Sequence, residues 1–154
     1  MDQIQNKESH KEIERKFLIH RLPSHMASYP CFHITQGYLC REPVVRVRKE
    51  NEDYILTYKG KGLLSHTEYN LPLTKEAFEA LIQKCEGSLI QKKRYKIPLP
   101  DGHIAEVDLF QGQREGTRLV EVEFTSLEEA RSFSPPEWFG EDVTQNPDYH
   151  NSNM

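Results

Sequence analysis

The sequence predicts one mostly β domain of the α+β class, built as an antiparallel barrel or sandwich with a few helices outside. Eight short segments alternate polar and apolar residues and are separated by turn signals, which is the pattern of β-strands. Only two segments show helical periodicity. With 154 residues, the chain has the length of a single ordinary domain. We expect residues 1–11 to form a flexible polar tail and residues 12–154 to form the domain.

The predicted strands follow one another along most of the chain. Two of the connections, ENED at 50–53 and PDG at 100–102, carry residues typical of hairpin turns. The eight predicted strands are Glu12–Ile19, Phe32–Leu39, Val44–Lys49, Tyr54–Lys59, Thr67–Leu73, Gln91–Ile97, His103–Phe110 and Arg118–Phe124.

Two predicted helices interrupt the strands. The first lies in TKEAFEALIQKCEG, where Thr74 is the expected N-cap and Gly87 the expected stop. The second begins in SLEEARSF, where Ser126 and Glu129 have the spacing of a capping box. The segment after Gly140 is short and polar, and no pattern assigns it to a helix or a strand.

The charges of the predicted strands lie mostly on one face. In VVRVRK, Arg46 and Arg48 share one face and Val45 and Val47 the other, because successive strand side chains point to opposite sides. A sandwich with its charged face in water would also give this pattern. These faces, however, hold few uncharged polar residues, and most strands carry one sign of charge. We therefore favour a closed eight-stranded antiparallel β-barrel with an ionised interior, whose apolar outside receives the helices.

The predicted interior is small and densely charged. A barrel of about eight strands has room only for side chains and one small ligand, and buried ions are costly unless they are paired. A polyanion would neutralise the basic strands and divalent cations the acidic ones, and phosphate chains with Mg²⁺ or Mn²⁺ have this composition. The predicted lumen residues are the bases Lys16, Arg46, Arg48, Lys59, Lys92 and Arg94 and the acids Glu12, Glu14, Glu68, Glu106, Asp108, Glu121 and Glu123.

Composition argues against several other classes. The three cysteines are an odd number without C-x-x-C spacing, which disfavours a disulfide scaffold or a zinc ribbon and fits a reducing cytoplasm. The net charge of −4 is unlike that of a nucleic-acid binder, so no nucleic-acid partner is expected. No apolar run approaches the ~20 residues of a membrane helix, and the N-terminus lacks the apolar core of a secretory signal. We expect a cytoplasmic protein without a membrane partner.

Glu12, Glu14 and Lys16 form E-x-E-x-K, which resembles the hallmark of the CYTH superfamily, the triphosphate tunnel metalloenzymes. The closest resemblance is to short bacterial members that resemble inorganic triphosphatases. It implies an eight-stranded antiparallel tunnel that binds a linear triphosphate, and hydrolysis of tripolyphosphate to pyrophosphate and phosphate with Mg²⁺ or Mn²⁺. The resemblance continues in order through QGYL (36–39), RVR (46–48), Lys59, Glu68, KKRY (92–95), EVD (106–108), EVEF (121–124) and WFGEDVT (138–144).

The resemblance also implies a role for each lumen residue. Arginine often binds phosphate oxygens through two parallel hydrogen bonds, and carboxylates bind the metal. Lys92 and Arg94 would in addition stabilise charge in the transition state, whereas Glu68 and Glu106 are further tunnel acids without an assigned role. The implied phosphate-binding residues are Lys16, Arg46, Arg48, Lys59, Lys92 and Arg94. The implied ligands of one or two metal ions are Glu12, Glu14, Glu121 and Glu123, with Asp108 as a helper.

Two choices stay open at the level of the sequence. The attacking water could be activated by Glu12 and Glu14, or by Lys16 with Tyr38 as a second catalytic pair. The substrate could instead be thiamine triphosphate, a nucleoside triphosphate or an RNA 5′-triphosphate, the reaction could be cyclisation of ATP, or the chain could bind polyphosphate without turnover.

Two further expectations concern the outside and the end of the barrel. The few helices leave apolar strand surface to cover, so a homodimer is plausible. Similar proteins continue as a helix after a C-terminal Y-x-N stretch, with a basic residue before the tyrosine. Here Asp148 precedes Tyr149 and the sequence ends at Met154, so we expect a shorter or disordered lid over one mouth of the tunnel.

Overall fold

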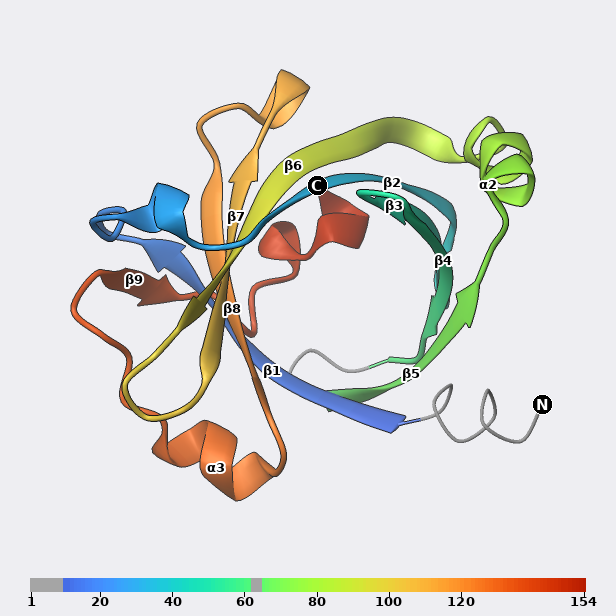
Figure 1. The fold of residues 1–154 in the computed structure, drawn as a ribbon. Helices are drawn as coiled ribbons and strands as arrows, with labels where there is room; N and C mark the ends of the chain where they lie inside the picture. Colours follow the sequence, from blue (N-terminus) through green and yellow to red (C-terminus); the bar gives the residue numbers. More distant parts are fainter. Residues whose placement is uncertain (1–9, 62–64) are drawn as a thin grey trace.

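The computed structural model describes residues 10–61 and 65–154, and its strands close into one antiparallel barrel (Figure 1). Neighbouring strands pair in the order β5, β4, β3, β2, β6, β7, β8 and β1, and β5 also pairs with β1, which closes the ring. The predicted eight-stranded barrel is therefore confirmed, and the sandwich is excluded. The barrel strands are β1 (His10–Ile19), β2 (Cys31–Arg41), β3 (Val44–Glu50), β4 (Asp53–Lys59), β5 (Ser65–Pro72), β6 (Glu86–Pro98), β7 (Ile104–Phe110) and β8 (Arg118–Phe124).

A short ninth strand, β9 (Phe139–Asp142), pairs with the end of β1. Because β8 occupies one edge of β1, β9 takes the part of the other edge that β5 does not cover. Most of the predicted tail, residues 1–9, lies outside the described residues, and β1 begins at His10, two residues before the predicted start.

The helix α2 (Lys75–Ile82) has the predicted N-cap, because the Thr74 hydroxyl accepts a hydrogen bond from the backbone N–H of Ala77 at 3.0 Å. Its predicted stop at Gly87 is wrong. Gly87 lies inside β6 with a φ of 67°, in a bulge where three residues of β6 face one residue of β2. Glycine adopts this left-handed backbone without strain, so it serves the bulge and not the helix end.

The helix α3 (Leu127–Ser132) shows only half of the predicted capping box. The Ser126 hydroxyl accepts from the backbone N–H of Glu129 at 3.0 Å, as expected. A capping box would have the Glu129 carboxylate accept from the backbone N–H of Ser126. It instead accepts from the backbone N–H of Thr125 at 3.2 Å and contacts His103 at 3.0 Å. Glu129 thereby joins α3 to the β6–β7 hairpin.

The hydrophobic core lies outside the barrel, against the wall that β1, β7 and β8 form. This arrangement follows from the strand pattern, because the apolar faces of these strands point away from the charged lumen. α3 and β9 cover this wall. The buried members of the core are Ile13, Phe17, Ile19, Ile97, Leu99, Ala105, Val107, Val120, Val122, Phe124, Ala130, Phe133 and Phe139.

Arg15, whose role the strand pattern does not reveal, fastens these outer elements to β1. Its guanidinium donates to the carbonyl oxygens of Ala130 at 2.9 Å and Phe133 at 3.3 Å, and to the carboxylate of Asp142 at 2.9 Å. It also lies 5.0 Å from the centroid of the Phe17 ring, within the range of a cation–π contact. One outward-facing arginine therefore links α3, β9 and the barrel wall.

On the other side of the barrel, α2 packs on β2, β3 and β4, with the Phe78 ring 5.3 Å from that of Tyr54 (Figure 1). Beyond α2, the outer faces of β4 and β5 leave Tyr58, Tyr69 and Leu71 partly exposed. The expected homodimer stays a prediction. Among the described residues, no helix is both long and apolar enough to cross a bilayer.

The end of the chain is ordered, so of the two expectations for the lid the disordered one is wrong and the shorter one stays a prediction. It forms two 3₁₀ turns, Pro147–Tyr149 and Asn151–Asn153, which lie within the ring of strands (Figure 1). Tyr149 and Met154 pack against an apolar layer, so the C-terminal segment fills one end of the barrel. The buried residues of this layer are Tyr38, Ile90, Phe110, Leu119 and Val143.

Candidate active site

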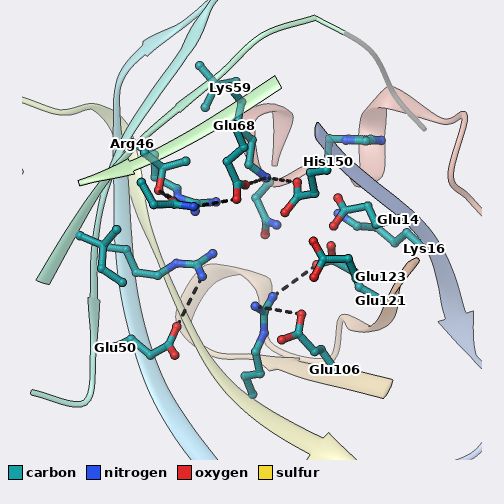
Figure 2. A pocket seen from close by; sticks show the side chains of 18 of the residues that line it. Glu14, Lys16, Arg46, Glu50, Lys59, Glu68, Glu106, Glu121, Glu123 and His150 are labelled. Atoms are coloured by element: carbon teal, nitrogen blue, oxygen red, sulfur yellow. Dashed lines mark hydrogen bonds and ion pairs between the residues drawn. The ribbon is translucent and has the colours of Figure 1, made fainter. Parts of the chain in front are cut away.

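The barrel encloses a cavity of about 430 Å³, and its wall is formed mainly by charged side chains (Figure 2). Alternation along each strand turns every second residue inward, and this explains why the predicted set gathers there. The predicted site residues that line the cavity are Glu12, Glu14, Lys16, Tyr38, Arg46, Arg48, Lys59, Glu68, Arg94, Glu106, Glu121 and Glu123. Lys92 and Asp108 are almost fully buried and do not line it.

Four carboxylates of β1 and β8, which we call the acid cluster, share one side of the cavity. Glu14 lies directly opposite Glu123 in the strand pairing, and Lys16 lies opposite Glu121. Figure 2 shows the side chains of Glu14, Glu121 and Glu123 close together, across the cavity from Arg46. The acid cluster consists of Glu12, Glu14, Glu121 and Glu123.

The carboxyl groups of the acid cluster act on one another's pKa values. Burial, followed by the charges of Glu121 and Glu12, raises the pKa of Glu14 well above its ordinary value. A hydrogen bond between the two side chains further raises the pKa of Glu14 and lowers that of Glu121. Burial alone would also raise the pKa of Glu121, but the charges of Lys16 and Arg94 hold it well below its ordinary value. The pKa values of the two carboxyl groups are thus displaced in opposite directions.

Arg46 and Arg48 of β3, which we call the arginine pair, place two positive charges on the cavity wall. Burial, together with the charges of Arg46 and Arg94, lowers the pKa of Arg48 to about 10. The Arg48 Nε donates to the side-chain amide oxygen Oε1 of Gln36 at 2.8 Å, and its Nη1 lies 3.5 Å from Glu50. These contacts orient the guanidinium but leave positive charge that an anion in the cavity could neutralise.

Arg94 stands between the two clusters and is held by three carboxylates. Asp108 binds it through two parallel hydrogen bonds of 2.7 and 2.8 Å, and Glu121 and Glu106 lie 3.3 and 3.4 Å away. Burial would lower the pKa of Arg94, but these charges raise it well above its ordinary value. Arg94 is therefore a fixed, fully charged donor at the cavity wall.

Lys92 lies behind Arg94. Its ammonium is 2.8 Å from Asp108 and 3.5 Å from the side-chain oxygen of Asn151. Burial lowers its pKa to about 7, against the attraction of Asp108. Both oxygens of Asp108 thus face Arg94 and Lys92. Burial alone would raise the pKa of Asp108, but the charges of Arg94 and Lys92 lower it to about 2. In this arrangement Asp108 holds Arg94 in place and does not line the cavity, and the expected helper role of Asp108 at the metal stays a prediction.

The C-terminal segment adds side chains that the sequence pattern did not indicate. Lys16 Nζ donates to the carbonyl oxygen of Tyr149 at 2.9 Å, and the imidazole of His150 contacts the carbonyl oxygen of Thr144 at 3.0 Å. Segments without periodicity give no signal of this kind. Glu50, Asn70 and Lys96, in contrast, continue the alternation of predicted lumen residues and could have been found from it. The lining residues with polar side chains that were missed are Glu50, Thr57, Asn70, Lys96, His150, Asn151 and Asn153.

The acid cluster fits a divalent cation by its chemistry. No three acidic, histidine or cysteine side chains of the described residues converge into a complete metal centre. Mg²⁺, however, is usually held by one or two carboxylates, with waters and substrate phosphates as the other ligands. The raised pKa of Glu14, caused by burial and by the charges of Glu121 and Glu12, indicates a position where a cation would relieve carboxylate repulsion.

The fold and the site together define an eight-stranded barrel whose lumen offers anion-binding arginines opposite cation-binding carboxylates. A sequence model of the CYTH domain matches residues 10–146, and the chain therefore belongs to the CYTH domain family. It is 40% identical over 143 residues to a protein of Nitrosomonas europaea named inorganic triphosphatase, which covers 91% of this chain and 93% of the relative.

Two further similarities span nearly the whole chain. The chain is 36% identical over 148 residues to a protein named inorganic triphosphatase from Acetivibrio thermocellus, which covers 94% of this chain and 92% of the relative. It also resembles the crystal structure of the inorganic triphosphatase NE1496, with a TM-score of 0.69 and 37% identity over 92% of each chain.

Proposed function

We propose that this protein hydrolyses inorganic triphosphate, that is tripolyphosphate, to pyrophosphate and phosphate, with Mg²⁺ or Mn²⁺ bound in the cavity. The observation that carries the proposal is that the acid cluster and the arginine pair face each other across one cavity. Burial, followed by repulsion from like charges, raises the pKa of Glu14 on one side and lowers that of Arg48 on the other. A metal–triphosphate complex carries both complementary charges, and the similarity to proteins named inorganic triphosphatase supports this substrate.

The arginine pair and Arg94 would bind the phosphate oxygens. Arginine suits this role because its planar guanidinium donates two parallel hydrogen bonds to a phosphate group. Lys59 is tied to Glu12 at 3.3 Å and to Glu68 at 3.6 Å, so it serves as a neighbouring charge rather than as the first clamp. The acid cluster would hold the cation, which when bound neutralises charge on the phosphate oxygens.

In the proposed reaction, a water attacks a terminal phosphorus while the bond to the bridging oxygen breaks. Pyrophosphate leaves, and the water oxygen stays on the released phosphate. Arg94 stabilises the charge that develops on the oxygens. A carboxylate with a raised pKa is a better proton acceptor than an ordinary one, so we assign the water proton to Glu14, assisted by Glu12. Lys16 with Tyr38, the alternative activators of the water, are less favoured because Lys16 already donates to the carbonyl oxygen of Tyr149.

Substrates with a ring or base have less support. Tyr38 is the only phenylalanine, tyrosine or tryptophan among the described residues that line the cavity. Its side chain is buried in the apolar layer below the C-terminal segment, with only 4% of the residue surface exposed. A thiamine or nucleobase ring would therefore lack an accessible phenylalanine, tyrosine or tryptophan ring on which to stack. We further propose a cytoplasmic location, since Cys31, Cys40 and Cys85 are free thiols.

A panel of four substrates tests this proposal. We expect phosphate release from tripolyphosphate in the presence of Mg²⁺, with a kcat/KM at least about tenfold above those for ATP, thiamine triphosphate and pyrophosphate. Omission of the metal and addition of a chelator should abolish release. Equal or faster turnover of ATP or thiamine triphosphate would reject the substrate assignment. Saturable binding of tripolyphosphate without turnover under any divalent ion would indicate a polyphosphate-binding module.

A further inference from the structure

A chain of polar side chains runs along the cavity wall across three neighbouring strands. Arg46 Nη2 donates to the Thr57 hydroxyl at 3.2 Å, and that hydroxyl donates to the side-chain oxygen of Asn70 at 2.6 Å. Asn70 Nδ2 in turn donates to Glu68 at 2.7 Å. Thr57 is fully buried, and the strand pairing places Arg46 opposite Thr57 and Thr57 opposite Asn70. The chain therefore rests on adjacent strands of a closed barrel and not on loops.

The hydrogen bonds of this chain all run in one direction. A guanidinium can only donate, so the Thr57 oxygen must accept from Arg46, and its single proton then goes to Asn70. The Asn70 oxygen is thereby used as an acceptor, and its N–H group donates to the carboxylate of Glu68. The direction of each bond fixes the orientation of the next group. Glu68 also lies 3.6 Å from Lys59.

Arg46 itself has an unused donor. Its Nε is buried and has no hydrogen-bond acceptor among residues 10–61 and 65–154. The residue is 7% exposed and lines the cavity, where Figure 2 shows it across from Glu14. A buried donor without an acceptor is costly, and this cost is removed if a ligand oxygen binds there.

We infer that Thr57, Asn70 and Glu68 are positioning residues that set the orientation of Arg46 for the triphosphate. One end of the guanidinium is held by Thr57, which leaves Nε for a phosphate oxygen. This inference rests on the proposed function, because it names the residues that prepare the substrate-binding arginine. Different results would reject the proposed function and the positioning role. The positioning role concerns affinity for tripolyphosphate, which can be measured whether or not the protein cleaves it.

Thr57→Val tests the inference with little change in side-chain volume. We expect the KM for tripolyphosphate, and its Kd measured by calorimetry with Ca²⁺ in place of Mg²⁺, to rise about tenfold, with kcat changed less than about threefold. Thr57→Ser keeps the hydroxyl and should restore KM and Kd. Thr67→Val is the matched control, because Thr67 is an exposed threonine on β5. It should leave both constants at the wild-type value.

Asn70→Asp tests the direction of the chain. The new carboxylate can accept from Thr57 but cannot donate to Glu68, so we expect a loss of affinity at least as large as that of Thr57→Val. A variant that was merely less folded would show a lower kcat and an unchanged KM. Unchanged KM and Kd in both variants, or a loss in Thr57→Val that Thr57→Ser does not restore, would overturn the inference. Binding of tripolyphosphate without cleavage, with Kd still weakened in both variants, would reject the proposed function and keep the positioning role. A wild-type protein that neither binds nor cleaves tripolyphosphate would reject both.

Discussion

Arg94→Ala is expected to lower kcat for tripolyphosphate by about a thousandfold or more, the effect typical of removing an arginine that stabilises phosphoryl-transfer charge. Arg94 is the one guanidinium of the site that two parallel hydrogen bonds to Asp108 fix in place at the cavity wall. It therefore needs little reorganisation when charge develops on the substrate. Steady-state kinetics on purified protein measures the loss.

The stability of this variant needs a control of its own. Removing Arg94 takes away one of the two cationic partners of the buried Asp108 and leaves only Lys92, and loss of a partner from a buried ion pair costs up to about 3–5 kcal/mol. The double variant Arg94→Ala with Asp108→Asn removes the charge of Asp108 as well. We expect its melting temperature to return toward the wild-type value while kcat stays low. Recovery of kcat in the double variant would show that Arg94 acts only on stability.

Glu14→Gln should lower Mg²⁺-dependent kcat by about a hundredfold and weaken the apparent affinity for Mg²⁺. In the metal-free protein the same change should increase stability, because it removes a carboxyl group that burial and the charges of Glu121 and Glu12 oppose. Loss of activity together with a gain in stability is not the behaviour of a structural residue. An equally active variant with unchanged Mg²⁺ activation would contradict the assignment of Glu14.

The raised pKa of Glu14 also predicts how stability depends on pH. Between the ordinary carboxyl pKa and the raised value, the folded protein holds a proton that the unfolded chain has released. Stability of the metal-free protein contributed by this group is therefore full at acidic pH and falls as pH rises through that window. We expect Mg²⁺ to raise the melting temperature more at alkaline than at acidic pH, and Glu14→Gln to abolish that difference.

The alternation of charges along the strands was enough to predict most of the cavity wall, but by itself it fitted a barrel and a sandwich equally. Arg46 and Arg48, for example, must share one face of any strand that contains both. The open choice was whether that face meets water, as in a sandwich, or the interior of a barrel. Closure of the ring by β5 and β1 decides it. The same rule extended by one step would have added Glu50 and Lys96, which also line the cavity.

The burial of individual side chains, and the contribution of the C-terminal segment to the cavity, could not be predicted in the same way. Alternation shows that Lys92 and Asp108 share the inner face, but not that Arg94 and the C-terminal segment cover them. His150 and Asn151 reach the cavity because Tyr149 and Met154 pack on the apolar layer, an event of tertiary structure without a local pattern. The roles of the individual site residues stay predictions that the variants above would test.

The central claim is that the two opposed clusters bind and cleave a metal–triphosphate complex, and phosphorus NMR of the products tests it most directly. With Mg²⁺, the signals of tripolyphosphate should give way to equal amounts of pyrophosphate and phosphate, and pyrophosphate should then persist. The reaction should stop when the metal is chelated. Tripolyphosphate that remains intact with Mg²⁺ and Mn²⁺ over the range of pH at which the protein is folded would contradict the account.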